Sequence, residues 1–361
     1  MAKKIYRVGI VGCGGIANGK HMPALKALPN VEMVAFCDIV PERAQKAREE
    51  FGAPDSKLYA TYQELAADPT LDAVHVCTPN KSHAPITIAA LEAGKHVMCE
   101  KPMAKTAREA QAMLDAARRA GKKLTIGYQG RFGPEAQYLK KVCEAGKLGE
   151  IYFAKAHAIR RRAVPTWGVF LNEEEQGGGP LIDIGTHALD LTLWEMDNYD
   201  VRYVVGNVYR KLADTKDAAN AWGPWDPAAY TVEDSAFGFI TMKNGATIVL
   251  ESSWALNTLD VGESQTTLCG TKGGADMKDG LRLNGEEFSQ TYVTKPDLGA
   301  DGVAFYDGEV KDPTVLEAET FYAAIETNGD PVVLPEQALM VTRVLEAIYE
   351  SSKTGKPVYF D

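Results

Sequence analysis

Two short stretches of the sequence carry side chains suited to proton transfer. Asp183, His187 and Asp190 stand at i, i+4 and i+7, a spacing that places all three on one face of a helix. Alone, Asp183 could cap the helix and His187 could be a satisfied core histidine. Together they favour proton transfer, because a neutral imidazole is the usual base toward a hydroxyl. The second stretch is Lys101-Pro102, a restrained cation after an apolar run, although a solvated lysine at a helix entry gives the same pattern.

A glycine-rich turn near the N-terminus predicts a dinucleotide site. Gly12-Cys13-Gly14-Gly15-Ile16-Ala17 follows an apolar run and opens a helical segment, the setting in which G-x-G-x-x-A is informative. Gly12 permits the tight turn, Gly14 lets the backbone approach a pyrophosphate, and Ala17 lets the helix pack on the strand. The first N–H groups of the helix then face the anion. We therefore expect cofactor contacts from Gly12, Gly14, Gly15, Ile16 and Ala17.

The end of the next strand indicates which dinucleotide is bound. Asp38 stands 21 residues after Ala17, where a carboxylate accepts hydrogen bonds from a ribose 2′-OH. A 2′-phosphate beside Asp38 would be repelled, and neither of the next two residues is an arginine. Arg43, one helical turn further on, could stack on adenine. The sequence therefore favours NAD over NADP.

Polar residues also follow the next two strands. Thr78-Pro79-Asn80, with His83 close behind, follows one apolar run, and Glu100-Lys101-Pro102 follows the other. Ligands of open parallel sheets sit beyond the carboxyl ends of the strands. We therefore expect both tripeptides to lie beside the nicotinamide half of the cofactor.

The elements that position these residues alternate in the first 126 residues, which predicts βαβ units and a doubly wound parallel sheet. The expected strands are Tyr6–Val11, Glu32–Cys37, Ala73–Cys77, His96–Cys99 and Leu124–Tyr128. The expected helices are Ile16–Leu28, Pro41–Phe51, Tyr62–Ala67, His83–Ala93 and Ala107–Ala120. This is the pattern of an N-terminal Rossmann domain, with a predicted range of 1–126.

After Tyr128 the pattern changes to an α+β domain, 127–361, with a large, mostly antiparallel open sheet. The expected strands are Ile151–Arg160, Val201–Arg210, Asp234–Met242, Thr247–Trp254, Ser264–Cys269 and Leu281–Leu283. The expected helices are Pro134–Glu144, Ile184–Glu195, Val315–Ile325 and Pro335–Ser351. Gly177–Gly179 is expected to be a pliant loop. Lys211–Tyr230 is expected to be an exposed loop, with Trp222 and Trp225 as a contact surface.

Composition excludes several classes of protein. The 361 residues are 45% hydrophobic and 24% charged, and 39 basic against 49 acidic residues give a net charge of −10, which disfavours nucleic acid. No apolar run approaches the length of a membrane helix, and no cleavable signal is expected. The six cysteines form no C-x-x-C pair, which suits structural thiols in a reducing, cytoplasmic setting and leaves no zinc motif. No third ligand accompanies Asp183 and His187, so no metal site is expected.

These motifs together resemble the Gfo/Idh/MocA oxidoreductases, the family of glucose–fructose oxidoreductase and inositol dehydrogenase. The likeness spans both expected domains, and Glu-Lys-Pro with the later Asp-x-x-x-His is its most specific part. The resemblance implies nicotinamide-dependent oxidation of a secondary hydroxyl of a sugar, glycoside or cyclitol. The family's catalytic residues fall on Lys101, Asp183 and His187, with His187 taking the hydroxyl proton. The resemblance also implies that Tyr128 and Arg131 contact the substrate, and that the protein is a homo-oligomer, either a dimer or a tetramer.

The segment before the glycine loop is a further expected part of the substrate site. Arg160 to Arg162 and Trp167 could line or cover the pocket, because an indole packs on a sugar ring and Arg donates to hydroxyls. A solvated edge strand would explain the arginines equally well. We assign substrate contacts to Arg161 and Trp167. The stretch 160–170 resembles family branches that act on glucosides, which implies oxidation at a ring carbon such as C3.

Two other functions fit the same motifs. The first is an NAD-dependent glycosidase or lyase, in which transient oxidation acidifies a neighbouring C–H, elimination follows and NAD is regenerated. The second is a dinucleotide sensor without catalysis, which the joint presence of Lys101, Asp183 and His187 disfavours. Release of aglycone without net NADH would distinguish the first alternative from a dehydrogenase.

Overall fold

The structure is a computed structural model that describes residues 4–298 and 311–360, and these form two compact units. Unit 1 comprises Met1–Gln129 with Lys311–Leu339, and unit 2 comprises Gly130–Val310 with Met340–Asp361. The expected ranges, 1–126 and 127–361, differ from these units at the late helix α10 (Pro313–Thr327). That helix belongs to unit 1 because Phe321 and Tyr322 are buried in the core formed around Tyr6 and Met22.

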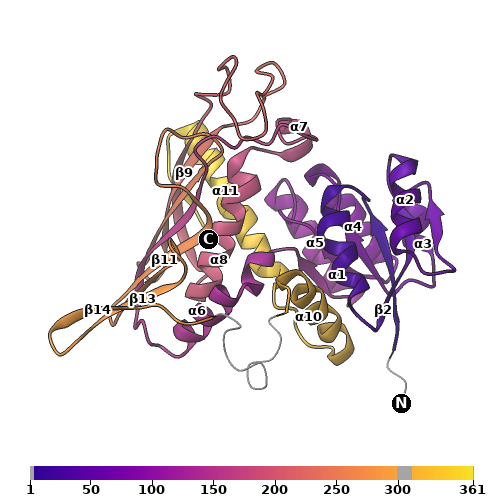
Figure 1. Cartoon of the computed structure of the whole chain (residues 1–361), viewed down its shortest axis with the longest axis horizontal. Coiled ribbons are helices and arrows are strands. Elements are labelled where there is room, and N and C mark those ends of the chain that lie inside the picture. The colour runs from indigo at the N-terminus through magenta and orange to yellow at the C-terminus, as the bar shows by residue number, and fades with distance from the viewer. Residues whose placement is uncertain (1–3, 299–310, 361) are drawn as a thin grey trace. The chain divides into compact units, whose positions relative to one another are not determined.

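Unit 1 contains a six-stranded sheet in the order β3-β2-β1-β4-β5-β6, and every strand pair is parallel (Figure 1). Its strands are β1 (Tyr6–Val11), β2 (Val31–Cys37), β3 (Lys57–Tyr59), β4 (Ala73–Val76), β5 (His96–Cys99) and β6 (Leu124–Ile126). This is the doubly wound Rossmann order, and it confirms the predicted fold class. The short edge strand β3 was not expected, because its three residues are too exposed to give an apolar run.

The helices of unit 1 are the predicted ones, with some ends shifted by one or two residues. They are α1 (Met22–Lys26) after a π-helical turn η1 (Ala17–His21), α2 (Pro41–Phe51), α3 (Tyr62–Ala67), α4 (His83–Glu92), α5 (Ala107–Ala120) and α10. Thr106 forms a capping box with Glu109 at the start of α5, and Gly121 ends it at φ 61°. The expected helix Ile16–Leu28 is therefore present, but its first turns are wider than α-helical.

Unit 2 contains a nine-stranded sheet in the order β14-β13-β12-β11-β7-β10-β9-β8-β15. All its strand pairs are antiparallel except β7 with β10, as predicted for a mostly antiparallel open sheet. Its strands are β7 (Ile151–Ile159), β8 (Val201–Tyr209), β9 (Ser235–Met242), β10 (Thr247–Ser253), β11 (Gly262–Gly270), β12 (Gly274–Asp276), β13 (Arg282–Glu287), β14 (Gln290–Thr294) and β15 (Val358–Tyr359). The last two and β12 were not expected, since they are short or exposed.

Helices cover one face of this sheet (Figure 1). They are α6 (Pro134–Glu144), η4 (Leu181–Gly185), which is a π-helical turn, α8 (Thr186–Met196) and the later part of α11 (Pro335–Thr354); α7 (Glu173–Gln176) is a single turn. Ile348 of α11 packs so closely on the sheet that a Cβ at Gly238 would lie 2.6 Å from its side chain. Among the described residues, no helix combines the length and apolarity that crossing a membrane requires.

Candidate functional site

The glycine-rich turn after β1 leaves open space beside its own backbone, where a ligand could approach. Gly12 has φ 88°, and a Cβ there would lie 2.6 Å from the carbonyl oxygen of Cys77, so the turn requires glycine. Gly14 and Gly15 differ, because a Cβ at either position would meet nothing within 4 Å. Packing within the chain therefore does not explain these two glycines. Close approach of a ligand to the backbone would explain them.

Asp38, directly after β2, fixes this turn. Its carboxylate accepts one hydrogen bond from the Cys13 N–H at 2.7 Å and another from the Val40 N–H at 2.8 Å. Each oxygen keeps further acceptor capacity, since an ionised carboxylate offers about four lone-pair sites. Arg43 lies exposed in the first turn of α2. The acceptor expected for a ribose is thus present and held in place.

His83 joins the two loops that follow β4 and β5. Its Nδ1 lies 2.8 Å from the carbonyl oxygen of Pro102, and its Nε2 lies 2.9 Å from the carbonyl oxygen of Thr78. The ring is fully buried, so both of its polar atoms are occupied inside the protein. His83 therefore acts on the cofactor region by positioning these loops. The buried Thr78 hydroxyl, in contrast, has no hydrogen-bond partner among the described residues, which suits contact with a ligand.

The loop that carries Lys101 rests on a buried ion network. Glu100 Oε1 lies 2.9 Å from Lys20 Nζ and 2.8 Å from His21 Nε2, and Lys20 Nζ also lies 2.9 Å from Glu317 Oε2. The other oxygen of Glu100 accepts from the Lys101 N–H at 3.1 Å. Burial alone would raise the pKa of Glu100, but Lys20 and His21 hold it well below its usual range. Glu100 is therefore an ionised anchor for the Lys101 backbone, and Lys101 itself is half-buried.

The network continues as a hydrogen-bonded chain of rings. His21 Nδ1 lies 2.9 Å from His75 Nδ1, and His75 Nε2 lies 3.0 Å from the Tyr322 hydroxyl. Because ionised Glu100 only accepts, His21 donates to it from Nε2. Burial lowers the pKa of His75 well below its usual range, so the second ring is neutral. The strand β4, the π-helical turn η1 and α10 are thus linked beneath one loop.

In unit 2, Asp183 and His187 are the accessible residues of a buried segment. From Leu181 to Glu195 every residue is buried except these two, which are half-buried. Asp183 lies in the π-helical turn η4, and His187 lies in the first turn of α8. The indole Nε1 of buried Trp254 donates to Asp183 Oδ2 at 3.0 Å. One carboxylate oxygen is thereby oriented from the end of β10.

Asp190 does not join this accessible pair, in contrast to the expectation that all three residues share one usable face. Its carboxylate accepts hydrogen bonds from Arg131 Nε at 2.9 Å and from a terminal guanidinium nitrogen of Arg131 at 2.6 Å. Both side chains are almost completely buried, which this two-point pairing permits. Arg131 therefore holds α8 in place, and its expected substrate contact stays a prediction. Tyr128, the other residue expected there, is also buried.

The glycine loop before Asp183 is closely packed, so the expectation that it is pliant was wrong. A Cβ at Gly178 would lie 2.0 Å from the Tyr349 hydroxyl, and one at Gly179 would lie 2.3 Å from the Glu233 carbonyl oxygen. The buried Glu233 carboxylate accepts from the Gly179 N–H at 2.8 Å and the Leu181 N–H at 3.1 Å. Glycine is needed at these two positions because Tyr349 and Glu233 lie too close for a side chain. Glu233 also fixes the turn that carries Asp183.

The loop expected to expose two tryptophans exposes one of them. Trp222 is 45% exposed, but Trp225 is only 5% exposed and donates from Nε1 to the Ala213 carbonyl at 2.8 Å. The prediction was wrong for Trp225 because its indole anchors the loop from inside. Trp167 is 50% exposed, and Arg161 is also exposed.

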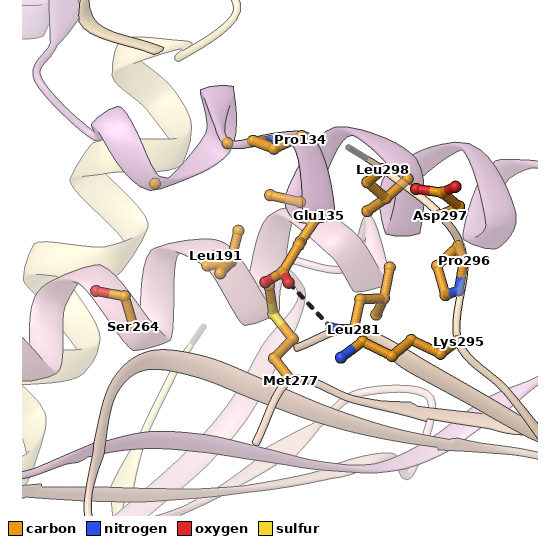
Figure 2. Close-up of a pocket in the computed structure, with 13 residues that line it drawn as sticks. Pro134, Glu135, Leu191, Ser264, Met277, Leu281, Lys295, Pro296, Asp297 and Leu298 are labelled. Atoms are coloured by element: carbon orange, nitrogen blue, oxygen red, sulfur yellow. Dashed lines mark hydrogen bonds between the residues drawn. The ribbon is translucent and has the colours of Figure 1, made fainter. Parts of the chain in front are cut away.

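Unit 2 also contains a cavity of about 590 Å³ between the start of α6 and the sheet (Figure 2). Glu135 lies on its wall and accepts from the Leu281 N–H at 3.1 Å. The remaining lining residues labelled in Figure 2 include Leu191, Ser264, Met277 and Lys295. None of the predicted site residues lines this cavity, so it adds nothing to the predicted chemistry.

Several residues of this arrangement were missed in the sequence. His21 had a signal, since Ala17, His21 and Leu25 recur at helical spacing on the buried face. Glu233 and Trp254 had none, because they lie more than 50 residues from the atoms that they contact. Only the folded sheet brings them to the turn that carries Asp183.

A Rossmann sheet with an open glycine turn, an anchored lysine loop and an accessible Asp–His pair defines a dinucleotide-dependent oxidoreductase. Residues 6–128 match the oxidoreductase family GFO_IDH_MocA, described as an NAD-binding Rossmann fold, and residues 140–360 match its C-terminal alpha/beta domain. The chain therefore belongs to the GFO/IDH/MocA oxidoreductase family, as the motifs predicted. It is therefore an enzyme, an oxidoreductase.

Relatives along the whole chain support this assignment. The chain is 36% identical to the D-glucoside 3-dehydrogenase of Escherichia coli K12, covering 99% of this chain and 98% of that protein. It is 29% identical to D-xylose 1-dehydrogenase (NADP(+)) 2 of Haloferax volcanii, covering 98% and 99%. The aldose-aldose oxidoreductase from Caulobacter crescentus, complexed with glycerol, has a similar structure, with a TM-score of 0.81, 26% identity and coverage of 99% and 100%.

Proposed function

We propose that this chain uses NAD to oxidise a secondary hydroxyl of a sugar, glycoside or cyclitol, and that its preferred position is C3 of a glucoside. The single observation that carries the reaction is the accessibility of Asp183 and His187 in a segment otherwise buried. The 36% identity to a protein named D-glucoside 3-dehydrogenase supports the choice of C3.

Three side chains have assigned roles. His187 takes the hydroxyl proton, which must leave as the carbon–hydrogen bond breaks. Asp183, oriented by Trp254, orients that imidazole and stabilises its protonated form. Lys101, on the loop anchored by Glu100, binds the same hydroxyl and stabilises the developing negative charge on its oxygen.

The glycine turn, Asp38 and the loop at Thr78 would hold NAD. When bound, NAD accepts the hydride that leaves the carbinol carbon. The fit is supported by the open space at Gly14 and Gly15 and by the unpartnered Thr78 hydroxyl. We assign Ile16, Ala17, Arg43, Pro79 and Asn80 to the same site.

Asp38 gives the preference for NAD a direct test. Asp38→Ala should weaken NAD binding by about tenfold, because a charge-assisted hydrogen bond contributes about 1.5–3 kcal/mol. It should leave NADP binding unchanged or stronger, since a repelling carboxylate is removed. Calorimetric titration with both dinucleotides measures this. Equal losses for the two would show that the carboxylate acts only by fixing the turn.

The reaction itself is tested with a panel of glucosides, free sugars and inositols incubated with NAD. Formation of NADH together with a keto sugar, in equal amounts, is expected. Aglycone release with only catalytic NAD and no net NADH would instead establish the glycosidase or lyase function. Absence of both products across the panel would contradict the proposed substrate class.

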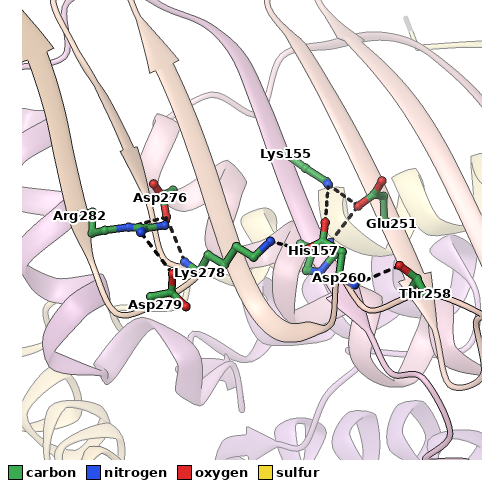
Figure 3. Close-up of polar contacts among 9 residues, drawn as sticks. All are labelled: Lys155, His157, Glu251, Thr258, Asp260, Asp276, Lys278, Asp279 and Arg282. Carbon is green, nitrogen blue, oxygen red and sulfur yellow. Dashed lines mark hydrogen bonds and ion pairs between the residues drawn. The ribbon is translucent and has the colours of Figure 1, made fainter. Parts of the chain in front are cut away.

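We also propose that a second copy of the chain covers the open face of the nine-stranded sheet. On this face Val205, Phe239 and Val249 stand side by side in register on β8, β9 and β10, and Phe239 is 44% exposed. Beside them, Lys155 Nζ and His157 Nδ1 lie 2.7 and 2.8 Å from Glu251 (Figure 3). An apolar strip next to a charged border is typical of an interface between like subunits.

The charged residues beside the apolar strip are paired with one another within the chain. Figure 3 shows Lys278 contacting Asp260, and Arg282 contacting Asp276 and Asp279, at 2.6, 2.7 and 3.2 Å. Since these charges are already neutralised within the chain, a partner would meet few unpaired ions at this border. The association would therefore depend on the apolar strip.

A further inference from the structure

Two tryptophans on different loops of unit 2 form one exposed aromatic surface. Trp167 and Trp222 have ring centroids 4.8 Å apart at an interplanar angle of 87°, and about half of each side chain is exposed. We propose that these two residues, the tryptophan platform, bind the aglycone or the second sugar ring of a glycoside. This inference rests on the proposed glycoside oxidation, which it extends from the reacting ring to the rest of the substrate.

The platform is held in a fixed shape by hydrogen bonds between its loops. The side chain of Asn220 accepts from the Val164 N–H at 2.8 Å and donates to the Val164 carbonyl at 2.9 Å. Thr166 Oγ1 donates to the Trp222 carbonyl at 2.8 Å. Two exposed indoles are therefore presented at a set angle without further ordering, and pre-organisation of this kind lowers the entropy lost on binding.

A series of aromatic contacts leads from the platform to the predicted chemistry. The ring of Trp167 lies 5.8 Å from that of Phe170, and Phe170 lies 6.4 Å from Trp254. Trp254 in turn donates to Asp183 at 3.0 Å. Phe170 and Trp254 therefore link the platform to the carboxylate through adjoining side chains. A glycoside whose reacting ring lies at Asp183 must extend beyond that ring to reach the platform.

The guanidinium nearest to Trp222 is paired with a carboxylate within the chain. The guanidinium of Arg160 lies 5.4 Å from the Trp222 ring centroid and is paired with Glu263 through two contacts of 2.6 and 2.7 Å. Arg162 donates to the Asn257 side chain at 2.6 Å. Glu263 thus neutralises Arg160, the guanidinium that lies over Trp222, and the indole faces suit the apolar face of a pyranose or an aromatic aglycone.

Exposure of Trp222 is not explained by the loop itself. Trp225, three residues later, packs against Tyr230 at 6.0 Å and anchors the same loop from inside. The loop therefore has its structural tryptophan already. An exposed pair of large apolar rings is costly in water, and its position near Asp183 gives it a use in binding.

The test compares substrates that differ only beyond the reacting ring. Trp222→Ala is assayed with methyl glucoside and with phenyl glucoside or cellobiose. We expect kcat/KM to fall about tenfold for the two-ring substrates, the effect of losing one aromatic contact, and less than about twofold for methyl glucoside. Equal losses of kcat/KM on both kinds of substrate, or no loss on either, would overturn the proposed role of the platform.

A second readout keeps this test separate from the proposed reaction. Saturation-transfer NMR measures contact between the protein and the phenyl ring of phenyl glucoside without any turnover. Loss of that signal in Trp222→Ala supports the platform even if no glucoside is oxidised, while an unchanged signal overturns it. Phe288→Ala is the control, because Phe288 is 90% exposed on the β13–β14 turn and outside the predicted site.

Discussion

His187 is the residue on which the proposed proton transfer depends. His187→Ala should lower kcat by about 10²–10⁴, the usual contribution of a general base, and should leave NAD affinity nearly intact. Stopped-flow turnover with calorimetric NAD titration measures both quantities. His96→Asn is the matched control, because His96 lies at the start of β5 and its Nδ1 accepts from the Lys123 N–H. Unchanged turnover in His187→Ala would remove this residue from the mechanism.

Single residues were predictable from the sequence where their spacing is local. The glycine turn, Asp38, Lys101, Asp183 and His187 belong to short motifs, and each lies at the end of a strand or on a helix as predicted. Trp225 was misjudged because a polar, Gly- and Pro-containing loop can still bury one large ring.

At the scale of elements, Glu100 links α10, the helix after β1 and the loop after β5. Glu100→Gln should lower the free energy of unfolding by about 1.5–3 kcal/mol, because it removes one of the two carboxylates that pair with buried Lys20. Urea denaturation at neutral pH measures this change. Glu92→Gln is the control, since Glu92 pairs with Arg119 at the surface and should cost less than about 1 kcal/mol. Equal small effects would show that the network contributes little to stability.

The partly buried His96 at the start of β5 should make the stability depend on pH. Burial lowers the pKa of His96 to about 4, so the folded state binds its proton less readily than the unfolded state does. The resulting stability is fully present above the ordinary histidine pKa of about 6.5 and is lost as pH falls from there toward 4. We expect His96→Asn to reduce this fall in the free energy of unfolding by about 1–2 kcal/mol, a figure that allows for the partial exposure of the imidazole. The asparagine keeps an acceptor for the Lys123 N–H.

Thermal unfolding of both proteins at closely spaced pH values between 4 and 7 checks the His96 prediction. If the variant and the parent fall in parallel across that window, His96 is not the group responsible.

Elements were predicted well where burial gives a strong pattern and poorly where long-range contacts decide. The parallel strands β1, β4 and β5 are fully buried or nearly so, and their apolar runs are clear in the sequence. The edge strands β3 and β14 are exposed and gave no pattern. The glycine loop looked flexible because the residues that pack on Gly178 and Gly179 come from distant parts of the chain.

For the whole molecule, the proposed second copy on the open sheet face predicts a change in assembly. Phe239→Glu should convert an oligomer to a smaller species, because a charge would have to be buried in the apolar strip. Light scattering after gel filtration gives the mass. Phe288→Glu, on an exposed turn, should leave the mass unchanged. A monomeric parent protein, or an unaltered mass in Phe239→Glu, would contradict this interface.

Oxidation at C3 is tested by following a labelled hydrogen. A glucoside carrying deuterium at C3 is incubated with NAD and the enzyme, and the deuterium is located by NMR. We expect it on the nicotinamide ring of NADH, in an amount equal to the keto sugar formed. Deuterium that stays on the sugar, or product formed without labelled NADH, would contradict oxidation of this carbon.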